Sequence, residues 1–313
     1  MKTRQQGVAL VTALLVVSLA TVAAVAMATR FQVDMRRTGN LLNGEQAYAY
    51  ALAAESWAYV ILRRDSKESQ HDSLDEDWST ALPPIPVEGG FVNGYVEDLQ
   101  GRFNVNNLVG VGGGLDQVQL DYYKRLLDVL GLEPALAPAL QDWIDPDIDT
   151  TFPDGAEDDE YLLADVPYRA ANRSLVDISE LRLVKGYTPE VLAVLEPHVT
   201  ALPAATVINV NTATPAVLQA LHADLEEADV EQLLEARNGE PFTDKAAVIA
   251  HNSLAGLELL VDVDIKSDWF NVQTDVSVGR GRARLDSRLL RGQDKLQIVS
   301  RTRTGRRILP VQE

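Results

Sequence analysis

The chain has 313 residues, of which 46% are hydrophobic, so it can bury a core and is long enough for roughly two or three packed units. It contains no cysteine, which excludes disulfides, thiol catalysis and cysteine-ligated zinc. The formal net charge of -18 opposes binding to nucleic-acid phosphates.

A long apolar segment follows a short basic leader at the N-terminus. Residues 8–29 carry no charged side chain and as a helix would be about 33 Å long, enough to cross the hydrocarbon core of a bilayer. Three interpretations compete: a secretory signal cleaved near Ala28, an uncleaved anchor, and a prepilin-type leader. The apolar run is longer than the ~7–15-residue core of a secretory signal, which counts against the first.

Gly7 points to the third interpretation. A basic leader that ends in glycine and runs directly into an apolar helix resembles the leader of type IV prepilins. In that class prepilin peptidase cuts after the glycine and typically methylates the new N-terminus. The resemblance implies that residues 1–7 are a leader peptide, that residues 8–29 stay as a transmembrane helix, and that Val8 is the first mature residue. Most of the class has Glu at the fifth mature position, where this chain has Thr12. A charge in lipid must be paired, so the usual Glu needs a partner from a neighbouring subunit. The absence of that Glu fits a subunit at the very end of a filament.

The helical pattern continues beyond the membrane segment to about Arg64, with no proline to interrupt it. Residues 65–86 are polar and then proline-rich, which predicts a loop. Residues 91–105 predict two short strands around a turn, and residues 109–114 form a glycine-rich linker.

Residues 116–266 are mostly helical by pattern, and after Asp268 the hydrophobic period changes to two. The second pattern predicts an antiparallel meander. The order of elements therefore indicates a helical insertion within one α+β domain. The helix boundaries are marked by Gly131, by a capping box at Asp177 and Glu180, by Thr188-Pro189, and by a helical pair over 212–221 and 226–237.

The phrase from Ile208 to Ala213 resembles the start of helix-hairpin-helix units in competence-type DNA-binding proteins. Those units meet phosphate through a glycine-rich hairpin, whereas residues 221–227 here contain no glycine, Lys or Arg. Between residues 207 and 260 only Arg237 and Lys245 are basic. We therefore expect the fold of such a unit without binding to nucleic acid.

Ten carboxylates gather between Asp142 and Asp165, and neither Lys nor Arg occurs between Asp142 and Tyr168. The alternation of Asp145, Asp147 and Asp149 is typical of loops that wrap calcium, which takes six to eight oxygen ligands. The segment is not an EF-hand, because Thr150 stands in place of the mid-loop glycine. Two other interpretations are a hydrated acidic loop and a loop paired with the basic residues that crowd 280–307. Magnesium is less favoured because it prefers fewer protein ligands.

Catalytic motifs are lacking in the sequence. The four histidines are scattered without metal-ligand spacing, and no nucleophile elbow, phosphate loop or dinucleotide fingerprint is found. We therefore expect a protein that is not an enzyme.

Several motifs occur in a fixed order and, with the Gly7 leader and Thr12, resemble the minor pseudopilin K family of type II secretion systems over essentially the whole chain. The resemblance implies an α+β pseudopilin fold: a long N-terminal transmembrane helix and an antiparallel sheet, with a large all-α insertion that is SAM-like or helix-hairpin-helix-like. The implied parts are the pseudopilin helix and first strands (30–105), a first helical unit with the acidic loop (106–205), a second unit (206–267), and C-terminal strands (268–313). The motifs are Gly101 to Leu108, Asp142 to Asp147, Gly155 to Asp158, Pro167 to Asn172, Ser179 to Arg182, and Ile208 to Ala213.

The same resemblance implies a single-pass protein of the inner membrane with its bulk in the periplasm. It would cap the pseudopilus tip and nucleate assembly for the export of folded proteins across the outer membrane. The implied partners are minor pseudopilins I and J in a heterotrimeric tip complex, other pseudopilins including H and the major pseudopilin G, and prepilin peptidase. The alternatives are a tip adaptor that recognises secreted cargo and a helix-hairpin-helix DNA-uptake protein.

The resemblance also implies calcium in the acidic region. On the matching positions the implied ligands are Asp145, Asp147, Glu157 and Asp158, with Asp149 and Asn172 as further candidates. Asn172 has the alternative role of capping a turn, which is the commoner role for Asn.

Overall fold

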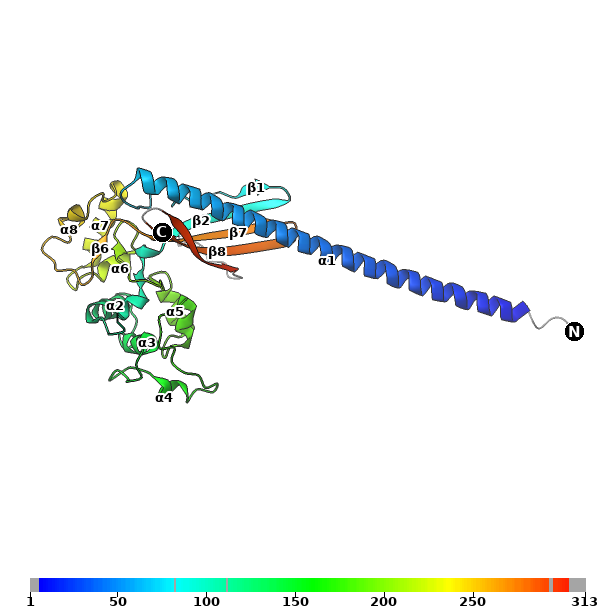
Figure 1. Cartoon of the computed structure of the whole chain (residues 1–313), viewed down its shortest axis with the longest axis horizontal. Helices are drawn as coiled ribbons and strands as arrows, with labels where there is room; N and C mark the ends of the chain where they lie inside the picture. The colour runs from blue at the N-terminus through cyan, green and yellow to red at the C-terminus, as the bar shows by residue number, and fades with distance from the viewer. Residues whose placement is uncertain (1–5, 82, 111, 293–294, 304–313) are drawn as a thin grey trace.

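A computed structural model describes residues 6–81, 83–110, 112–292 and 295–303. Its first element is one continuous helix, α1 (Gln6–Glu68), of 63 residues. At 1.5 Å per residue such a helix is about 95 Å long, and Figure 1 shows its N-terminal half standing clear of the rest of the chain. The apolar window of this half is long enough to cross a membrane and none of it is buried. The leader residues Lys2 and Arg4 lie outside the described residues.

The second half of α1 lies along a five-stranded antiparallel sheet in the order β1-β2-β7-β8-β9 (Figure 1). β2 and β7 are neighbours over their length, from Gly90 opposite Val278 to Asp98 opposite Phe270. Because residues 99–268 connect these two strands, the helical part is an insertion between adjacent strands, as the sequence predicts. The strands are β1 (Ile85–Val87), β2 (Gly90–Asp98), β7 (Trp269–Val278), β8 (Gly281–Arg291) and β9 (Leu296–Arg303).

Small side chains let α1 lie close to the sheet. Ala47, Ala51 and Ala58 are buried on one helix face together with Leu62. On the strand side, a Cβ atom built on Gly281 would lie 2.4 Å from the backbone carbon of Asn43, so only glycine fits there. The buried and half-buried side chains of β7 alternate almost throughout, which confirms the period-two prediction.

The insertion holds two helical segments, each closed by a short parallel strand pair. β3 pairs with β4 and β5 pairs with β6, so the pairs bracket residues 103–200 and 208–264. The elements are η1 (Leu99–Gly101), β3 (Phe103–Asn104), η2 (Val105–Leu108), α2 (Gln117–Val129), α3 (Leu136–Ile144), α4 (Asp158–Tyr161), η3 (Ile178–Leu183), α5 (Pro189–Leu195), β4 (Val199–Thr200), β5 (Ile208–Asn209), α6 (Pro215–Gln219), α7 (Glu227–Gly239), α8 (Lys245–Ile249) and β6 (Val263–Asp264).

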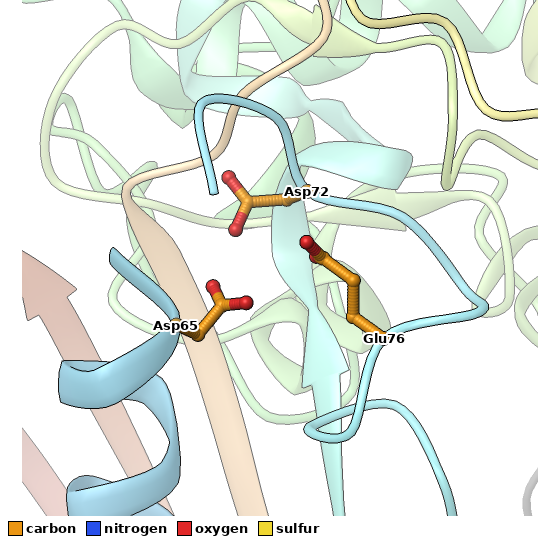
Figure 2. Close-up of side chains that lie close together, drawn as sticks. All are labelled: Asp65, Asp72 and Glu76. Carbon is orange, nitrogen blue, oxygen red and sulfur yellow. The ribbon is translucent and has the colours of Figure 1, made fainter. Parts of the chain in front are cut away.

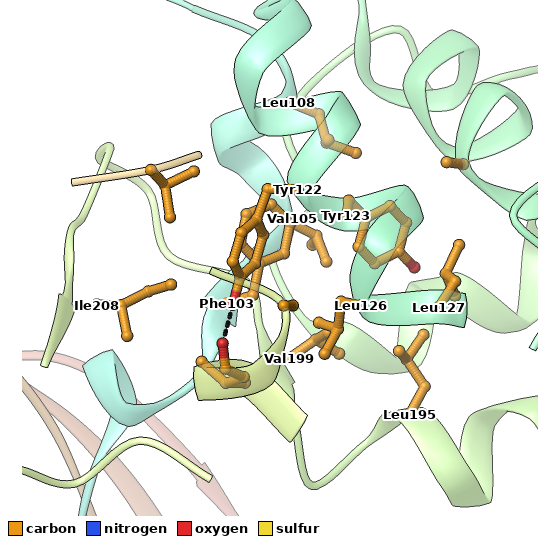
Figure 3. Close-up of a cluster of buried hydrophobic side chains, with 14 of the residues drawn as sticks. Phe103, Val105, Leu108, Tyr122, Tyr123, Leu126, Leu127, Leu195, Val199 and Ile208 are labelled. Carbon is orange, nitrogen blue, oxygen red and sulfur yellow. Dashed lines mark hydrogen bonds between the residues drawn. The ribbon is translucent and has the colours of Figure 1, made fainter. Parts of the chain in front are cut away.

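One hydrophobic core runs through both helical segments (Figure 3). The ring of Phe103 stacks on Tyr123 with centroids 5.5 Å apart. The hydroxyl of Tyr122 donates to the carbonyl of Val217, 2.7 Å away in the second segment. A Cβ atom on Gly101 would lie 2.5 Å from the carbonyl oxygen of Thr212, so the segments touch backbone to backbone there. The two segments therefore form one body.

Buried asparagines account for two of the sequence motifs. The side-chain amide of Asn106 donates to the carbonyls of Leu175 and Leu202, both at 2.9 Å. The Asn211 amide exchanges two hydrogen bonds with the backbone of Phe242, at 2.9 and 3.0 Å. Such bonds satisfy backbone groups that turns leave unpaired inside a core. The asparagines of both motifs thus join segments of the insertion that are distant in sequence.

Most predicted elements are confirmed, and a few differ in detail. The loop predicted over 65–86 ends in β1, a three-residue strand. The capping box at Asp177 and Glu180 is present, but it starts the 3-10 helix η3 instead of an α-helix. α3, α4 and α8 were not predicted individually, because elements of nine, four and five residues are too short to show a period.

Candidate metal centre in the acidic loop

Aromatic side chains hold together the two ends of the acidic loop, residues 142–172. Trp143 meets Tyr161 edge to face with ring centroids 5.0 Å apart, and Tyr161 stacks on Tyr168 at 5.3 Å. The hydroxyl of Tyr168 donates to the carbonyl of Leu183 at 2.9 Å. The loop is therefore attached to the core of the insertion at both ends.

Asp142 folds the loop back on itself. Its side chain is 0% exposed, and Oδ2 accepts hydrogen bonds from the backbone amides of Thr151 and Ala156, at 3.0 and 2.8 Å. A Cβ atom on Gly155 would lie 2.1 Å from that oxygen, which explains why glycine precedes Ala156. Within the described residues, the other oxygen of Asp142 receives no hydrogen bond.

Asp145, Asp147 and Glu157 each bring one carboxylate oxygen within 4.8 Å of the other two. Asp145 ends α3 and Glu157 precedes α4, so helix ends fix two of the three. These two are 6% and 2% exposed, whereas Asp147 is open to solvent. In the part of the chain that the structure describes, Asp145 Oδ1 and both oxygens of Glu157 lack a hydrogen-bond partner.

Burial raises the pKa of Asp145 to about 6, and the charges of Asp147 and Asp142 add to the effect. Burial likewise raises the pKa of Glu157 to about 7, with Asp142 and Asp145 contributing. Carboxylates that are buried together without a cation favour their protonated forms. A divalent cation held by these carboxylates would favour their ionised forms and so oppose both shifts.

Asn172 is joined to this cluster through Asp147. Its amide nitrogen donates to the backbone carbonyl of Asp147 at 2.7 Å, while its own Oδ1 is buried and accepts no hydrogen bond from the described residues. Its backbone is left-handed, with φ of 45°, a conformation that Asn adopts more readily than most residues. A ligand role and a turn role are thus compatible at this position.

Two predicted ligands do not join the cluster. The carboxylate of Asp158 accepts hydrogen bonds from Arg169 and from the backbone amide of Ala170, both at 3.0 Å. Asp149 is exposed, and only its backbone amide takes part, as a donor to Asp147 Oδ1 at 2.8 Å. Of the predicted ligands, the structure gathers Asp145, Asp147 and Glu157.

The basic C-terminal strands are engaged away from the acidic loop. Arg288 pairs with Asp177, and Arg301 pairs with Glu55. Arg291 pairs with Asp65 and Asp72. Among the described residues, the ion pairs of the loop are Arg169 with Asp158 and Lys185 with Glu160. These pairs do not support the interpretation in which the C-terminal strands neutralise the loop. Arg306 and Arg307 lie outside the described residues.

The donor atoms of the cluster are all oxygens, which suits a hard cation such as calcium. Buried carboxylate oxygens without partners are what such an ion would satisfy. Sequence reasoning missed the positioning role of Asp142. The signal was there, because apart from Gln141 the residues around Asp142 from Ala137 to Ile144 are apolar, and a solvated carboxylate is not expected among them.

Comparison with known proteins identifies the family. The model described as "Type II secretion system (T2SS), protein K" matches residues 101–204 and 208–271. Relatives named type II secretion system protein K from Pseudomonas aeruginosa and Aeromonas hydrophila are 36% and 34% identical; the alignments cover 96% of this chain and 93% and 98% of those proteins.

A solved structure agrees with the sequence comparisons. A chain in the crystal structure of the GspK-GspI-GspJ complex from the enterotoxigenic Escherichia coli Type 2 Secretion System superposes with a TM-score of 0.78 at 26% identity. The match covers 86% of this chain and 100% of that chain. By sequence and by fold, this chain belongs to the type II secretion system protein K family.

Proposed function

We propose that the chain is the minor pseudopilin that caps the tip of a type II secretion pseudopilus, assembled there with minor pseudopilins I and J. Its family and its similarity to a chain of the GspK-GspI-GspJ complex support this role. The apolar half of α1 anchors the chain in the inner membrane by a single pass, and the bulk of the chain lies in the periplasm.

The position of the insertion is the observation that carries the capping role. Residues 99–268 lie at the end of the sheet away from the membrane half of α1 (Figure 1). If α1 packs beside the helices of other pseudopilins, including H and the major pseudopilin G, the insertion lies above the helix bundle. No further subunit can then be added on top, and the chain can only begin a filament.

Thr12 supports a terminal position. Its hydroxyl donates to the carbonyls of Val8 and Ala9, at 3.1 and 3.0 Å, so its polar group is satisfied within the helix. A neutral side chain here needs no charged partner from a subunit above it.

Co-purification of the full-length chain with I and J from detergent extracts tests the proposal. We expect a complex with one copy of each of the three chains. Absence of a ternary complex, with each chain folded by circular dichroism, would contradict the tip-cap role.

Processing of the N-terminus belongs to the same proposal. Prepilin peptidase would remove residues 1–7 by cutting after Gly7 and would methylate Val8. The apolar helix that follows supports this, because it must be retained if the chain is to pack among other pseudopilin helices. A Gly7→Ala variant tests the cleavage site, and we expect the uncut precursor to accumulate.

Calcium binding is a second part of the proposal. Asp145, Asp147 and Glu157 would supply carboxylates and Asn172 an amide oxygen, while Asp142 positions the loop. When bound, the ion neutralises the clustered charge and fixes the loop between α3 and α4. In calorimetric titration we expect Asp145→Asn to remove the calcium uptake of the acidic loop, and the exposed Asp149→Asn to leave the total uptake unchanged. Equal uptake by the wild-type chain and Asp145→Asn would refute this site.

We infer that the chain acts by assembly and does not act as an enzyme or bind DNA. In the region that resembles helix-hairpin-helix units, Arg237 is buried and donates to the carbonyls of Val210 and Ala213, at 2.9 and 2.6 Å. Lys245 pairs with Asp262 at 2.6 Å. These two cations are thus used within the fold and do not form a phosphate-binding surface.

A cargo-recognising tip adaptor is the second candidate, and one observation favours it. Phe152, Leu163 and Val166 are 92%, 85% and 78% exposed on the acidic loop, at the end of the insertion. Large apolar side chains left in solvent on one loop are candidates for an interaction site. Selective exoprotein binding that is lost in a Phe152→Ser, Leu163→Ser variant, with the I and J complex intact, would support the adaptor. Equal exoprotein binding by the wild-type chain and this variant would exclude the adaptor role for these residues.

A further inference from the structure

A second group of carboxylates lies far along the chain from the acidic loop. Asp65 stands in the last turn of α1, and Asp72 and Glu76 follow in the loop after it. One oxygen from each lies within 4.8 Å of the others. Figure 2 shows the three carboxyl groups facing a common space between the end of α1 and this loop.

Asp72 has an unsatisfied oxygen in the interior. Its side chain is 0% exposed, and Oδ2 accepts hydrogen bonds from Arg291 and from the backbone amide of Ser267, 2.8 Å away. Its Oδ1 has no hydrogen-bond partner among the described residues. A buried carboxylate oxygen without a partner is energetically costly, so it indicates a partner that the protein atoms alone do not supply.

Glu76 is held so that one oxygen remains for another partner. Its Oε2 accepts the backbone amide of Ser73 at 3.0 Å and the indole nitrogen of Trp78 at 2.8 Å. These two donors fix the direction of the carboxylate without neutralising it. The indole of Trp78 is therefore in direct contact with the cluster.

The charges of the cluster do not balance. Arg291 pairs with Asp65 at 3.3 Å and also with Asp72. Among the described residues, it is the cation that forms ion pairs with the three carboxylates. Three carboxylates against one guanidinium leave a formal surplus of two negative charges. Burial, together with the charges of Glu76 and Asp72, raises the pKa of Asp65 to about 7. One proton would cancel half of the surplus, whereas one divalent cation would cancel all of it.

We propose that Asp65, Asp72 and Glu76 bind a divalent cation, calcium by preference, at a site separate from the acidic loop. Oxygen donors select a hard cation, and three carboxylates favour calcium because magnesium usually takes one or two and keeps its waters. The site is independent of the tip-cap role proposed above.

The ion would fasten the insertion to α1. The backbone amide of Asp72 donates to the carbonyl of Ile265 at 2.8 Å, and its carbonyl accepts the side-chain amide of Asn209 at 3.0 Å. Asn209 lies at the start of the second helical segment and Ile265 directly follows its end, so both are at the base of the insertion. An ion held by Asp65 and Asp72 therefore joins the last turn of the long helix to the body that it carries.

The test uses full-length protein in detergent, in which the acidic loop is disabled by Asp145→Asn and Glu157→Gln. Calorimetric titration with calcium should show one remaining site per chain. Adding Asp65→Asn or Glu76→Gln should weaken this site by about tenfold or more, since ligand charge sets calcium affinity. Asp75→Asn is the matched control, because Asp75 lies in the same loop and is exposed. It should leave the affinity unchanged.

Terbium gives a second measurement that locates the site. Energy transfer from Trp78 should produce terbium luminescence in the loop-disabled chain, and calcium should displace it. Asp72→Asn risks misfolding because it disturbs Arg291, so Asp65→Asn and Glu76→Gln decide the question. No calcium uptake by the folded, loop-disabled chain overturns the proposal, as does uptake that neither substitution weakens.

Discussion

The guanidinium of Arg301 on β9 forms a bidentate ion pair with the carboxylate of Glu55 on α1. Nε donates to Oε2 and Nη2 donates to Oε1, both at 2.7 Å. Glu55 is 2% exposed and also accepts a hydrogen bond from the hydroxyl of Ser287 on β8. One buried carboxylate in the last quarter of the long helix thus joins two strands of the sheet to it.

Arg301→Ala should destabilise the fold because, among the described residues, the buried carboxylate of Glu55 would keep only the hydroxyl of Ser287 as a hydrogen-bond partner. We expect a loss of about 1–3 kcal/mol in the free energy of unfolding, measured by urea titration in detergent. Lys245→Ala is the control, since it removes the exposed pair with Asp262 and should cost less than about 1 kcal/mol. Equal losses in the two variants would show that Glu55 does not depend on Arg301.

Gly281→Ala should separate α1 from the sheet. The added methyl group would lie 2.4 Å from the backbone of Asn43, and backbone cannot move aside as a flexible side chain does. Overpacking of this kind costs about 1–3 kcal/mol. Gly44→Ala provides the contrast: no atom of the described residues lies within 4 Å of its Cβ position, and alanine in a helix should stabilise by about 0.5–1 kcal/mol. Thermal unfolding of both variants checks the opposite signs, and a stable Gly281→Ala chain would contradict the close contact.

The fold was largely predictable because its long elements carry strong periods. The apolar helix, the alternating strands after Asp268 and the helical insertion between them are all confirmed. The common core of the two helical segments was not predicted, because contacts such as Tyr122 with Val217 join residues far apart in sequence. The buried asparagines were recognised as a motif, but their role needed the positions of the backbone groups that they satisfy.

Gly155→Ala should weaken calcium binding by the acidic loop. The methyl group would displace Asp142 Oδ2 from the amides of Thr151 and Ala156, so the loop would lose the bonds that fold it. We expect the affinity to fall by about 10–100-fold, as for other residues that orient metal ligands. Gly114→Ala should leave the titration unchanged, because in the part of the chain that the structure describes no atom lies within 4 Å of its Cβ position. Unaltered calcium affinity in Gly155→Ala would exclude this role for Asp142.

Stability without calcium should fall as pH rises. Asp145 and Glu157 have pKa values of about 6 and about 7 in the fold, above the unfolded values of about 4. The folded chain therefore binds more protons than the unfolded chain across this range, and stability decreases from about pH 4 to about pH 7. Calcium should abolish the decrease, because the ion replaces the protons.

Thermal unfolding in chelator and in calcium measures this pH dependence. Asp145→Asn, Glu157→Gln should show a smaller decrease in chelator than the wild-type chain, since amides do not titrate. A decrease of the same size in the variant and the wild-type chain would assign it to other groups.

The candidate site was predicted in part. Alternating carboxylates indicated Asp145 and Asp147, and the family resemblance added Glu157. The sequence could not show that Asp158 forms an ion pair with Arg169, because this pairing depends on how the loop closes over α4. Asp65, Asp72 and Glu76 were not predicted as a group at all. They meet only because the chain turns back after α1, and no spacing rule describes that turn.

Retention of the apolar half of α1 after processing is the claim on which the tip position depends. The intact mass of the protein purified from inner membranes measures it directly. We expect a chain that begins at Val8 and carries one methyl group. A chain that begins at Thr29 would have lost the membrane helix, and the proposed place at the tip of the pseudopilus would be wrong.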